Sequence, residues 1–264
     1  MPLTGEAPFS NASLTIAAEI DDLVGRKGST SVAACIPARD EAETIGAVVA
    51  MCRALQLAEV VDEVVVIDDH SEDDTATIAK EHGAIVISNA AEPGKGEALQ
   101  CGVANTSADV VVFLDADVTN ISSRFITRLL DPLLVSPQVQ LVKASYVRPL
   151  NGRPAEGGRV TELVARPLLR RFFPALADVA QPLAGECALR RSALDQIVLG
   201  ARYEIEIGLL IDIYRRFGRA AIVDADLGER VHRNRSLVEL GGQAGDVLNA
   251  VLARALPGLE PTNT

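Results

Sequence analysis

The chain has 264 residues, of which 48% are hydrophobic and 3% aromatic, and it contains no tryptophan. This length suits one large domain or two fused halves, with a core that must be mainly aliphatic. The formal net charge of −11 argues against a nucleic-acid or anionic-membrane surface, because such a surface needs a basic face. A local basic pocket for a small anion remains compatible with this charge.

The cysteines and the N-terminal stretch indicate a cytoplasmic protein. Cys35, Cys52, Cys101 and Cys187 form no Cys-x-x-Cys pair, which argues against zinc and thioredoxin-like sites. Scattered free thiols are typical of a reducing compartment. The N-terminal stretch has no basic start followed by a long apolar run, so no secretory signal is predicted. No stretch reaches the ~18–20 apolar residues of a membrane helix, so no membrane partner is expected.

Short apolar strands alternate with helices in the first half of the chain. A polar tail and a short amphipathic helix, Leu14 to Val24, come first. Strands are then predicted at residues 31–36, 63–67, 84–88 and 109–117, with helices at 43–55, 75–82 and 97–104 between them. This alternation of nearly continuous apolar strands with helices predicts an α/β fold, in which a parallel sheet carries helices on both faces.

The second half is less regular. Helices are predicted at 122–134 and 203–217, strands at 139–147 and 220–227, and a final helix ending near Ala255. A glycine-rich loop opens a further helix within residues 156–173, and a polar loop covers residues 228–236. The change of pattern near residue 120 predicts two lobes that share one sheet.

Two aspartates end the fourth predicted strand. Asp115 and Asp117 follow the apolar run from Val110 to Leu114, and strand alternation would point both side chains the same way. Like charges this close repel unless a cation or a hydrogen-bond donor lies between them. Mg²⁺ and Mn²⁺ prefer oxygen ligands, and ligands of open α/β sheets bind beyond the carboxyl ends of the strands. The pair indicates a metal–diphosphate site or, alternatively, a solvated turn in which Asp117 caps the next helix.

Polar residues follow the other strands at the same edge of the predicted sheet. Asp40 or Glu41 could accept hydrogen bonds from a nucleobase or ribose, or could cap a helix. Asp69, after the second predicted strand, could face a nucleobase, or could stabilise the turn in which it lies. Lys95 lies between two glycines ahead of a helix, where backbone N–H groups and a lysine could hold a diphosphate. The pattern is not that of a P-loop, and a surface lysine in a turn is the alternative.

A local basic cluster interrupts this acidic chain near its end. Arg230, His232, Arg233 and Arg235 lie within six residues. A neutral histidine nitrogen can ligate a divalent ion, and arginines suit bidentate recognition of phosphate or carboxylate. The alternative is a solvated loop.

Two further segments of the second half carry polar groups beside glycines or helix starts. In "EGGRVTE", glycine N–H groups, Arg159 and the Thr161 hydroxyl could form a second anion site. Glu204 and Glu206 precede an apolar helix, and one of them could accept hydrogen bonds from sugar hydroxyls.

The order of these segments resembles the GT-A glycosyltransferases, in which a nucleotide-binding half ends in an Asp-x-Asp motif. It resembles the glucosyl-3-phosphoglycerate synthases more closely, over roughly Val32 to Leu252. The resemblance implies a GT-A fold, a Rossmann-like and mostly parallel sheet flanked by helices with a C-terminal acceptor-binding lobe. It divides one continuous domain into a tail with a short helix (1–30), a nucleotide-sugar-binding half (31–120) and an acceptor-binding half (121–264). The matching segments are "GKGEAL", "DVVVFLDAD", "QLVKASYVRPL", "GGRVTELVARPLL", "EIGLLID" and "HRNR".

Members of that family transfer glucose from a nucleoside-diphosphate donor, usually UDP-glucose, to the 2-hydroxyl of 3-phosphoglycerate. Configuration is retained, and Mg²⁺ or Mn²⁺ is needed. The resemblance also implies a cytoplasmic homodimer whose partners are the nucleotide-sugar and a small anionic acceptor. The implied donor-binding residues are Pro37, Ala38, Glu41, Asp69, Lys95, Asp115, Ala116, Asp117, Tyr203, Glu206 and Arg230. The implied acceptor-binding residues are Gly158, Arg159, Thr161, Asn234 and Arg235, the implied metal ligands are Asp117 and His232, and the implied catalytic residues are Lys95, Asp117, Glu206 and Arg230.

The chain departs from the family pattern at three places in the donor region and at one near the acceptor. Arg39 stands where a leucine is expected, Asp69-His70 replaces a Ser-Gly pair, and the segments before Lys95 and Gly157 are short. The sequence therefore does not determine the identity of the donor base, of the sugar or of the phosphorylated acceptor. Alternative interpretations are an inverting transferase of the polyprenyl-phosphate mannosyl type, a sugar nucleotidyltransferase, a haloacid-dehalogenase-type phosphatase and a non-catalytic nucleotide-binding protein.

Overall fold

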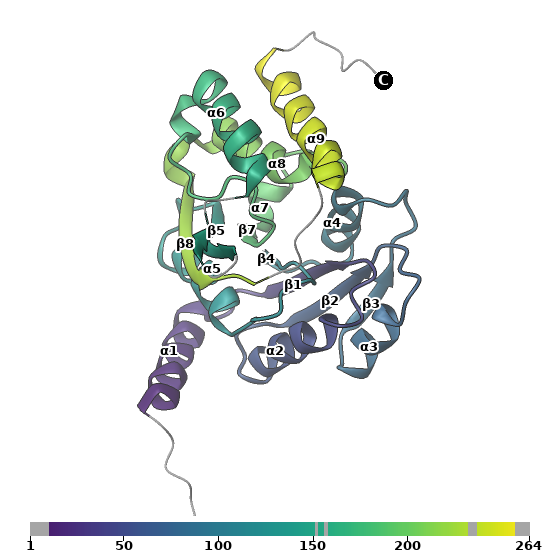
Figure 1. Cartoon of the computed structure of the whole chain (residues 1–264). Coiled ribbons are helices and arrows are strands. Elements are labelled where there is room, and N and C mark those ends of the chain that lie inside the picture. Colours follow the sequence, from purple (N-terminus) through teal and green to yellow (C-terminus); the bar gives the residue numbers. More distant parts are fainter. Residues whose placement is uncertain (1–10, 151–152, 156–157, 232–236, 257–264) are drawn as a thin grey trace, which may run out of the picture.

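The structure is a computed structural model that describes residues 11–150, 153–155, 158–231 and 237–256. Within these residues, one eight-stranded sheet runs through the molecule with helices on both faces (Figure 1). The strands lie in the order β3-β2-β1-β4-β7-β5-β6, and β8 pairs with β5. Their bounds are β1 Val32–Ala38, β2 Glu63–Asp68, β3 Ile85–Ser88, β4 Val110–Phe113, β5 Leu141–Leu150, β6 Arg153–Ala155, β7 Cys187–Arg190 and β8 Ile222–Glu229.

The helices follow the predicted order with shifted ends. The first helix is longer than predicted, and Lys95 is the first residue of α4 where the prediction began two residues later. The α-helices are α1 Asn11–Lys27, α2 Ile45–Leu57, α3 Thr75–Glu81, α4 Lys95–Ala104, α5 Arg124–Val135, α6 Arg166–Phe172, α7 Arg191–Leu194, α8 Glu204–Phe217 and α9 Leu237–Ala255. The other helical turns are the π-helical η1 Thr161–Ala165 and the 3₁₀ turns η2 Pro174–Leu176 and η3 Arg219–Ala221.

The predicted parallel sheet is confirmed in the first half of the chain. Strands β3, β2, β1 and β4 pair in parallel, as do β5 and β8. The pairs β4–β7, β7–β5 and β5–β6 are antiparallel. Strand β7 was not predicted, because its four residues are too few to show a periodic pattern, yet it joins the two halves of the sheet. The predicted fourth strand was too long, since β4 ends at Phe113.

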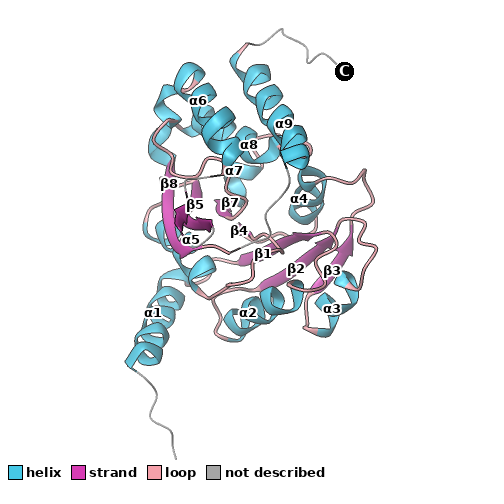
Figure 2. Ribbon diagram, in the orientation of Figure 1, coloured by secondary structure: helices cyan, strands magenta, loops and turns pink. Residues whose placement is uncertain are grey.

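Alternating side chains of the strands enter two separate cores. Ala34 and Ile36 of β1 pack on the face covered by α1, α2 and α5, whereas Ala33 and Cys35 pack on the face covered by α4, α6, α8 and α9 (Figure 2). Both faces are buried, which explains why these strands read as continuous apolar runs rather than as alternating ones. No helix in the described part of the chain is both long and apolar enough to span a membrane.

The sheet brings the ends of β1, β2 and β4 to one edge. Ala38 pairs with Asp68, so β1 and β2 end side by side, and Cys35 of β1 pairs with Phe113, the last residue of β4. The loops that leave these strands therefore start as neighbours. These loops hold most of the first-half residues that the sequence singled out.

Helix α5 gives a direct test of the core on its face of the sheet. Leu129 is 0% exposed, whereas Val135 at the end of the same helix is 63% exposed. We expect Leu129→Ala to lower the free energy of unfolding by about 2–5 kcal/mol through lost burial and a residual cavity. Val135→Ala should change it by less than about 0.5 kcal/mol. Urea denaturation of both variants measures this, and similar losses would contradict the described packing.

Candidate functional site

Six charged side chains from five separate segments meet at the carboxyl edge of the sheet. Lys95, the first residue of α4, places its Nζ atom 2.7 Å from Asp115 Oδ1 and 2.7 Å from Glu206 Oε1. Asp115 follows β4, and Glu206 lies in the first turn of α8. Burial alone would lower the pKa of Lys95, but the carboxylates of Asp115 and Glu206 outweigh it and hold that pKa well above its usual value. Lys95 is therefore a cation at any physiological pH.

Arg230 is the second cation of this cluster. Its Nη2 atom lies 2.7 Å from Asp115 Oδ2 and 3.0 Å from Asp117 Oδ1, and its Nε atom donates to Glu186 Oε1. The aromatic ring of Tyr146 lies 5.4 Å from the guanidinium carbon. Burial would lower the pKa of Arg230, yet the carboxylates of Glu186 and Asp115 raise it. One guanidinium thus lies between three carboxylates and reduces the repulsion among them.

The two aspartates converge as the sequence predicted, although not through strand alternation. Both lie beyond β4, where the chain turns at Ala116 and Asp117. Their convergence is shown by Arg230, because a single nitrogen atom contacts both carboxylates. The predicted requirement for a donor between them is met by Arg230.

Glu186 and Gly185 belong to the site, and sequence reasoning missed both. Glu186 is 0% exposed and lies directly before β7. A Cβ atom on Gly185 would lie 2.3 Å from Asp115 Oδ1 and 2.4 Å from Lys95 Nζ, so only glycine fits there without displacing them. A charged residue inside the otherwise uncharged segment "PLAGECAL" was the available signal.

The loops after β1 and β2 are bound to each other. The backbone N–H of Glu41 donates to Thr75 Oγ1 at 2.8 Å, and the N–H of Glu72 donates to Asp40 Oδ1 at 2.8 Å. Pro37 and Ala38 are the last residues of β1, beside these loops. The backbone N–H of Asp69 donates to the Ala38 carbonyl at 2.8 Å, so Asp69 lies beside the loop that holds Asp40 and Glu41.

Asp69 supports the loop that leads to Lys95. Its Oδ2 atom accepts from the Gly94 N–H at 3.0 Å, and its Oδ1 atom accepts from Asn89 Nδ2 at 2.7 Å. His70 adopts a left-handed conformation with φ of 62°, which explains how it replaces the glycine expected there. Its Nε2 atom donates to the carbonyl oxygen of Ala91 at 2.9 Å. The Asp69-His70 pair thus anchors the glycine-rich loop at two points.

A second set of hydrogen bonds joins the loop after β4 to the end of β8. Asn120 donates from Nδ2 to the Glu229 carbonyl at 2.7 Å and accepts at Oδ1 from the Val231 N–H at 2.9 Å. The backbone N–H and hydroxyl of Thr119 both donate to the Val231 carbonyl at 3.1 Å. These contacts bring Arg230 beside the aspartates across more than one hundred residues of chain.

Some of the remaining predicted residues lie in the described part of the chain, and the others lie outside it. Ala116 is buried beside the aspartates, and Tyr203 precedes α8. Gly158 and Arg159 precede η1, Thr161 is its first residue, and the Glu162 N–H donates to the Gly158 carbonyl at 3.1 Å. The residues proposed from the basic cluster that lie outside the described part of the chain are His232, Arg233, Asn234 and Arg235.

The donor atoms of the cluster fit a divalent cation bound together with a diphosphate. With all six groups ionised, four carboxylates face two cations, which leaves two negative charges unbalanced. Glu206 Oε2 is buried and accepts no hydrogen bond from the described residues. Within those residues, no three histidine, cysteine or carboxylate side chains form a ready-made metal site. A metal here would therefore need ligands from the aspartate pair and from a bound ligand or the segment after Val231.

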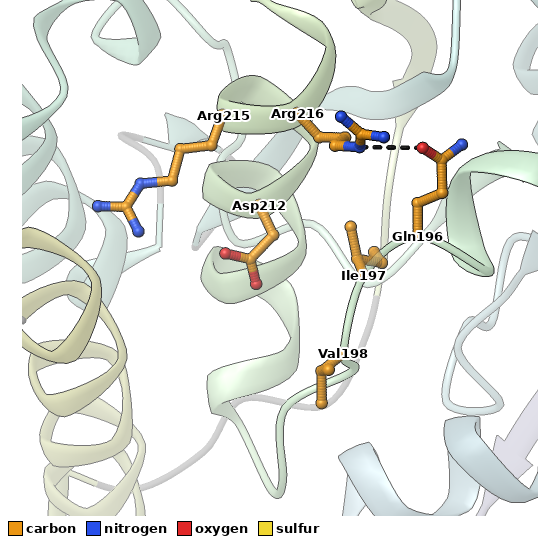
Figure 3. A pocket seen from close by; sticks show the side chains of 6 residues that line it. All are labelled: Gln196, Ile197, Val198, Asp212, Arg215 and Arg216. Carbon is orange, nitrogen blue, oxygen red and sulfur yellow. Dashed lines mark hydrogen bonds between the residues drawn. The ribbon is translucent and has the colours of Figure 1, made fainter.

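An open pocket of about 370 Å³ lies elsewhere on the molecule (Figure 3). It is lined by Gln196, Ile197, Val198, Asp212, Arg215 and Arg216, none of which belongs to the charged cluster. Arg216 is held across it by Gln196, with Nε 2.9 Å from Oε1 (Figure 3). The convergence of buried charges, rather than this hollow, defines the candidate active site.

The contact between α4 and the segment before α8 gives a test of the site's framework. A Cβ atom on Gly96 would lie 2.2 Å from the Gly200 carbonyl oxygen, whereas one on Gly242 of α9 would meet nothing within 4 Å. We expect Gly96→Ala to destabilise the protein by about 1–3 kcal/mol through overpacking against backbone. Gly242→Ala should stabilise it by about 0.5–1 kcal/mol. Urea denaturation of both variants distinguishes them, and equal effects would argue against the tight contact.

Comparisons with known proteins agree with this architecture. The family model described as "Glycosyl transferase family 2" matches residues 33–198. The glucosyl-3-phosphoglycerate synthase of Mycolicibacterium smegmatis is 42% identical over 246 residues, which cover 89% of this chain and 81% of that protein. The enzyme of the same name from Petrotoga mobilis is 39% identical over 241 residues, which cover 86% of this chain and 74% of that protein.

Solved structures of the Mycobacterium tuberculosis glucosyl-3-phosphoglycerate synthase are also similar. Its complex with Mn²⁺, UDP-glucose and phosphoglyceric acid has a TM-score of 0.84 and 40% identity, and the match covers 92% of this chain and 85% of that one. Its complex with Mg²⁺ and UDP has a TM-score of 0.84 and 41% identity, with the same coverage. The chain belongs to glycosyl transferase family 2 and, within it, to the family of the glucosyl-3-phosphoglycerate synthases.

Proposed function

We propose that this glycosyltransferase moves glucose from UDP-glucose to the 2-hydroxyl of 3-phosphoglycerate, with retention of configuration and with Mg²⁺ or Mn²⁺. The observation that carries the proposal is the convergence of Lys95 and Arg230 with the carboxylates of Asp115, Asp117 and Glu206 at one edge of the sheet. The similar enzyme from Mycobacterium tuberculosis binds UDP-glucose, phosphoglyceric acid and Mn²⁺ in one solved complex, which supports the same substrates here.

The chemical task is to break the bond between a sugar and a diphosphate. Negative charge grows on the departing diphosphate, and positive charge grows on the anomeric carbon. A divalent ion held by Asp117, with His232 proposed as its second protein ligand, would supply charge stabilisation for that diphosphate. Lys95 and Arg230 place two fixed positive charges beside Asp115, and fixed charges stabilise developing opposite charge without reorganisation.

Glu206 is the proposed contact for the glucose hydroxyls. Lys95 holds its Oε1 atom, while the buried Oε2 atom accepts no hydrogen bond from the described residues and could accept one from a sugar hydroxyl. The Oε2 atom therefore favours a sugar bound beside the start of α8.

We favour same-face attack over double displacement for the retaining reaction. In same-face attack, the departing diphosphate accepts the proton of the acceptor hydroxyl, so no enzyme nucleophile is needed. Double displacement needs a carboxylate free to attack the anomeric carbon. Glu206 is the fallback nucleophile, but its ion pair with Lys95 reduces its freedom to attack.

The acceptor would bind at the start of η1 and at the segment after Val231. The backbone of Gly158, the guanidinium of Arg159 and the hydroxyl of Thr161 suit a phosphate or carboxylate. Asn234 and Arg235 complete this proposed acceptor site. We also propose that the enzyme acts in the cytoplasm as a homodimer, a state that sedimentation velocity would measure.

Free UDP release is the measurement that tests the proposed function. We expect UDP to form from UDP-glucose in the presence of 3-phosphoglycerate and a divalent ion, and we expect EDTA to abolish it and Mg²⁺ or Mn²⁺ to restore it. GDP-glucose and ADP-glucose serve as donor controls. The product should carry an α-glucosidic linkage by NMR, as in the donor. UDP release that is independent of 3-phosphoglycerate, or a β-linked product, would contradict the proposal.

Replacing Glu206 distinguishes the two retaining mechanisms. Glu206→Gln keeps the shape and one oxygen acceptor, so same-face attack predicts a decrease in kcat of about 10- to 1,000-fold with activity still measurable. Glu204→Gln, in the same helical turn, is the control and should retain wild-type kcat. Complete loss of turnover in this variant, together with a glucosyl adduct on Glu206 of the wild-type protein detected by mass spectrometry, would instead assign Glu206 as a nucleophile.

A further inference from the structure

The carboxylate of Glu186 is fully buried, although its burial does not favour the stability of the fold. It is 0% exposed, and its Oε2 atom accepts no hydrogen bond from the described residues. A buried carboxylate oxygen without a donor reduces stability, and an apolar side chain of similar volume is often at least as stable. The position of this group therefore calls for a reason beyond folding.

The backbone around Glu186 is fixed from strand β5. Its carbonyl oxygen accepts from the Ala144 N–H at 3.0 Å, and the carbonyl of Ala184 accepts from the buried amine of Lys143. Gly185, between these two anchors, approaches Asp115 and Lys95 too closely for a side chain. Glu186 consequently has little freedom to move relative to the charged cluster.

The partner of Glu186 is Arg230, the residue that bridges the two aspartates. Glu186 accepts at Oε1 from Arg230 Nε, while Arg230 Nη2 contacts Asp115 and Asp117. The guanidinium is rigid and planar, so a fixed acceptor at Nε also fixes the direction of Nη2. Tyr146 limits its remaining freedom on one face, and Arg230 is only 3% exposed.

From these contacts we infer that Glu186 is a positioning residue for donor binding: it holds Arg230 in the one orientation that presents its charge at the aspartate pair. This inference rests on the proposed function, because the donor diphosphate is what the oriented charge would serve. Glu186 acts only through Arg230, and groups that orient the residues around a metal–diphosphate site commonly change affinity or activity by about 10- to 100-fold when replaced.

A double-mutant cycle tests whether Glu186 acts through Arg230. Glu186→Gln keeps an acceptor oxygen but removes the charge, and Arg230→Met keeps much of the volume but removes the guanidinium. We expect Glu186→Gln alone to weaken Mn²⁺-dependent UDP binding about 10-fold or more, measured by titration calorimetry. In the Arg230→Met background the same substitution should change UDP affinity less than about 2-fold, since its route of action is gone.

The unfolding temperature adds a readout that needs no substrate. Glu186→Gln should lower this temperature in the wild-type background, where it weakens an ion pair. In the Arg230→Met background, Glu186→Gln should raise the unfolding temperature, because it removes a buried charge that has lost its partner. If Glu186 only filled space, Glu186→Gln would change the unfolding temperature in the same direction in both backgrounds. Asp212→Asn, which weakens the 2.7 Å pair with Arg254 away from the cluster, is the control and should leave UDP affinity unchanged.

The outcomes separate this inference from the proposed function. Equal effects of Glu186→Gln on UDP affinity in both backgrounds, or no effect in the wild type, would overturn the positioning role. Failure of the wild-type protein to bind UDP with Mn²⁺ would overturn the proposed function, and the inference about the donor with it. The change of sign in unfolding temperature would then still report the ion pair itself.

Discussion

Arg230 holds together three carboxylates that come from distant parts of the chain. Asp115 and Asp117 follow β4, Glu186 precedes β7, and Arg230 itself follows β8. Without a cation between them, the two aspartates would repel each other, and Glu186 would be a buried charge without a counter-ion. The site depends on this one guanidinium, because it contacts three of the four carboxylates, and Lys95 joins the fourth, Glu206, to Asp115.

The fold supplies the conditions under which such an arrangement is stable. Strand β7 lies between β4 and β5, so it brings the loop before it against the loop after β4. Strand β8 pairs with β5 and ends where Asn120 and Thr119 bind the backbone of the following residues. These backbone contacts are made without charge, so they can hold Arg230 in place before any charged ligand binds.

Lys95 connects the cluster to the loops of the first half of the chain. It begins α4 and pairs with Asp115 and Glu206, and the loop before it is anchored by Asp69 and His70. From the sequence, Asp69 could face a nucleobase or stabilise the turn after the second strand. In the structure both of its carboxylate oxygens accept hydrogen bonds from the protein, so any role in base recognition would be added to its support of this loop. The excess of two negative charges in the cluster suits the addition of one divalent cation.

Much of the fold and part of the site were predictable from the sequence, because both depend on local patterns. The buried strands of the first half appear as apolar runs, and Lys95, Asp115 and Asp117 follow or precede such runs directly. Helix ends were less accurate, because terminal turns fray and hydrophobic periodicity does not mark where a helix stops. The acceptor residues and the second metal ligand stay predictions, and several of them lie outside the described residues.

Local patterns in the sequence determined the alternation of strands and helices, the aliphatic core and the family, since each is recorded in neighbouring residues. Only the tertiary structure decided which charges meet. Glu186 and Arg230 are 44 residues apart, and Asp69 and Gly94 are 25 apart. No local rule pairs them, because their contact depends on the order in which β7 and β8 join the sheet and on the close approach that Gly185 permits.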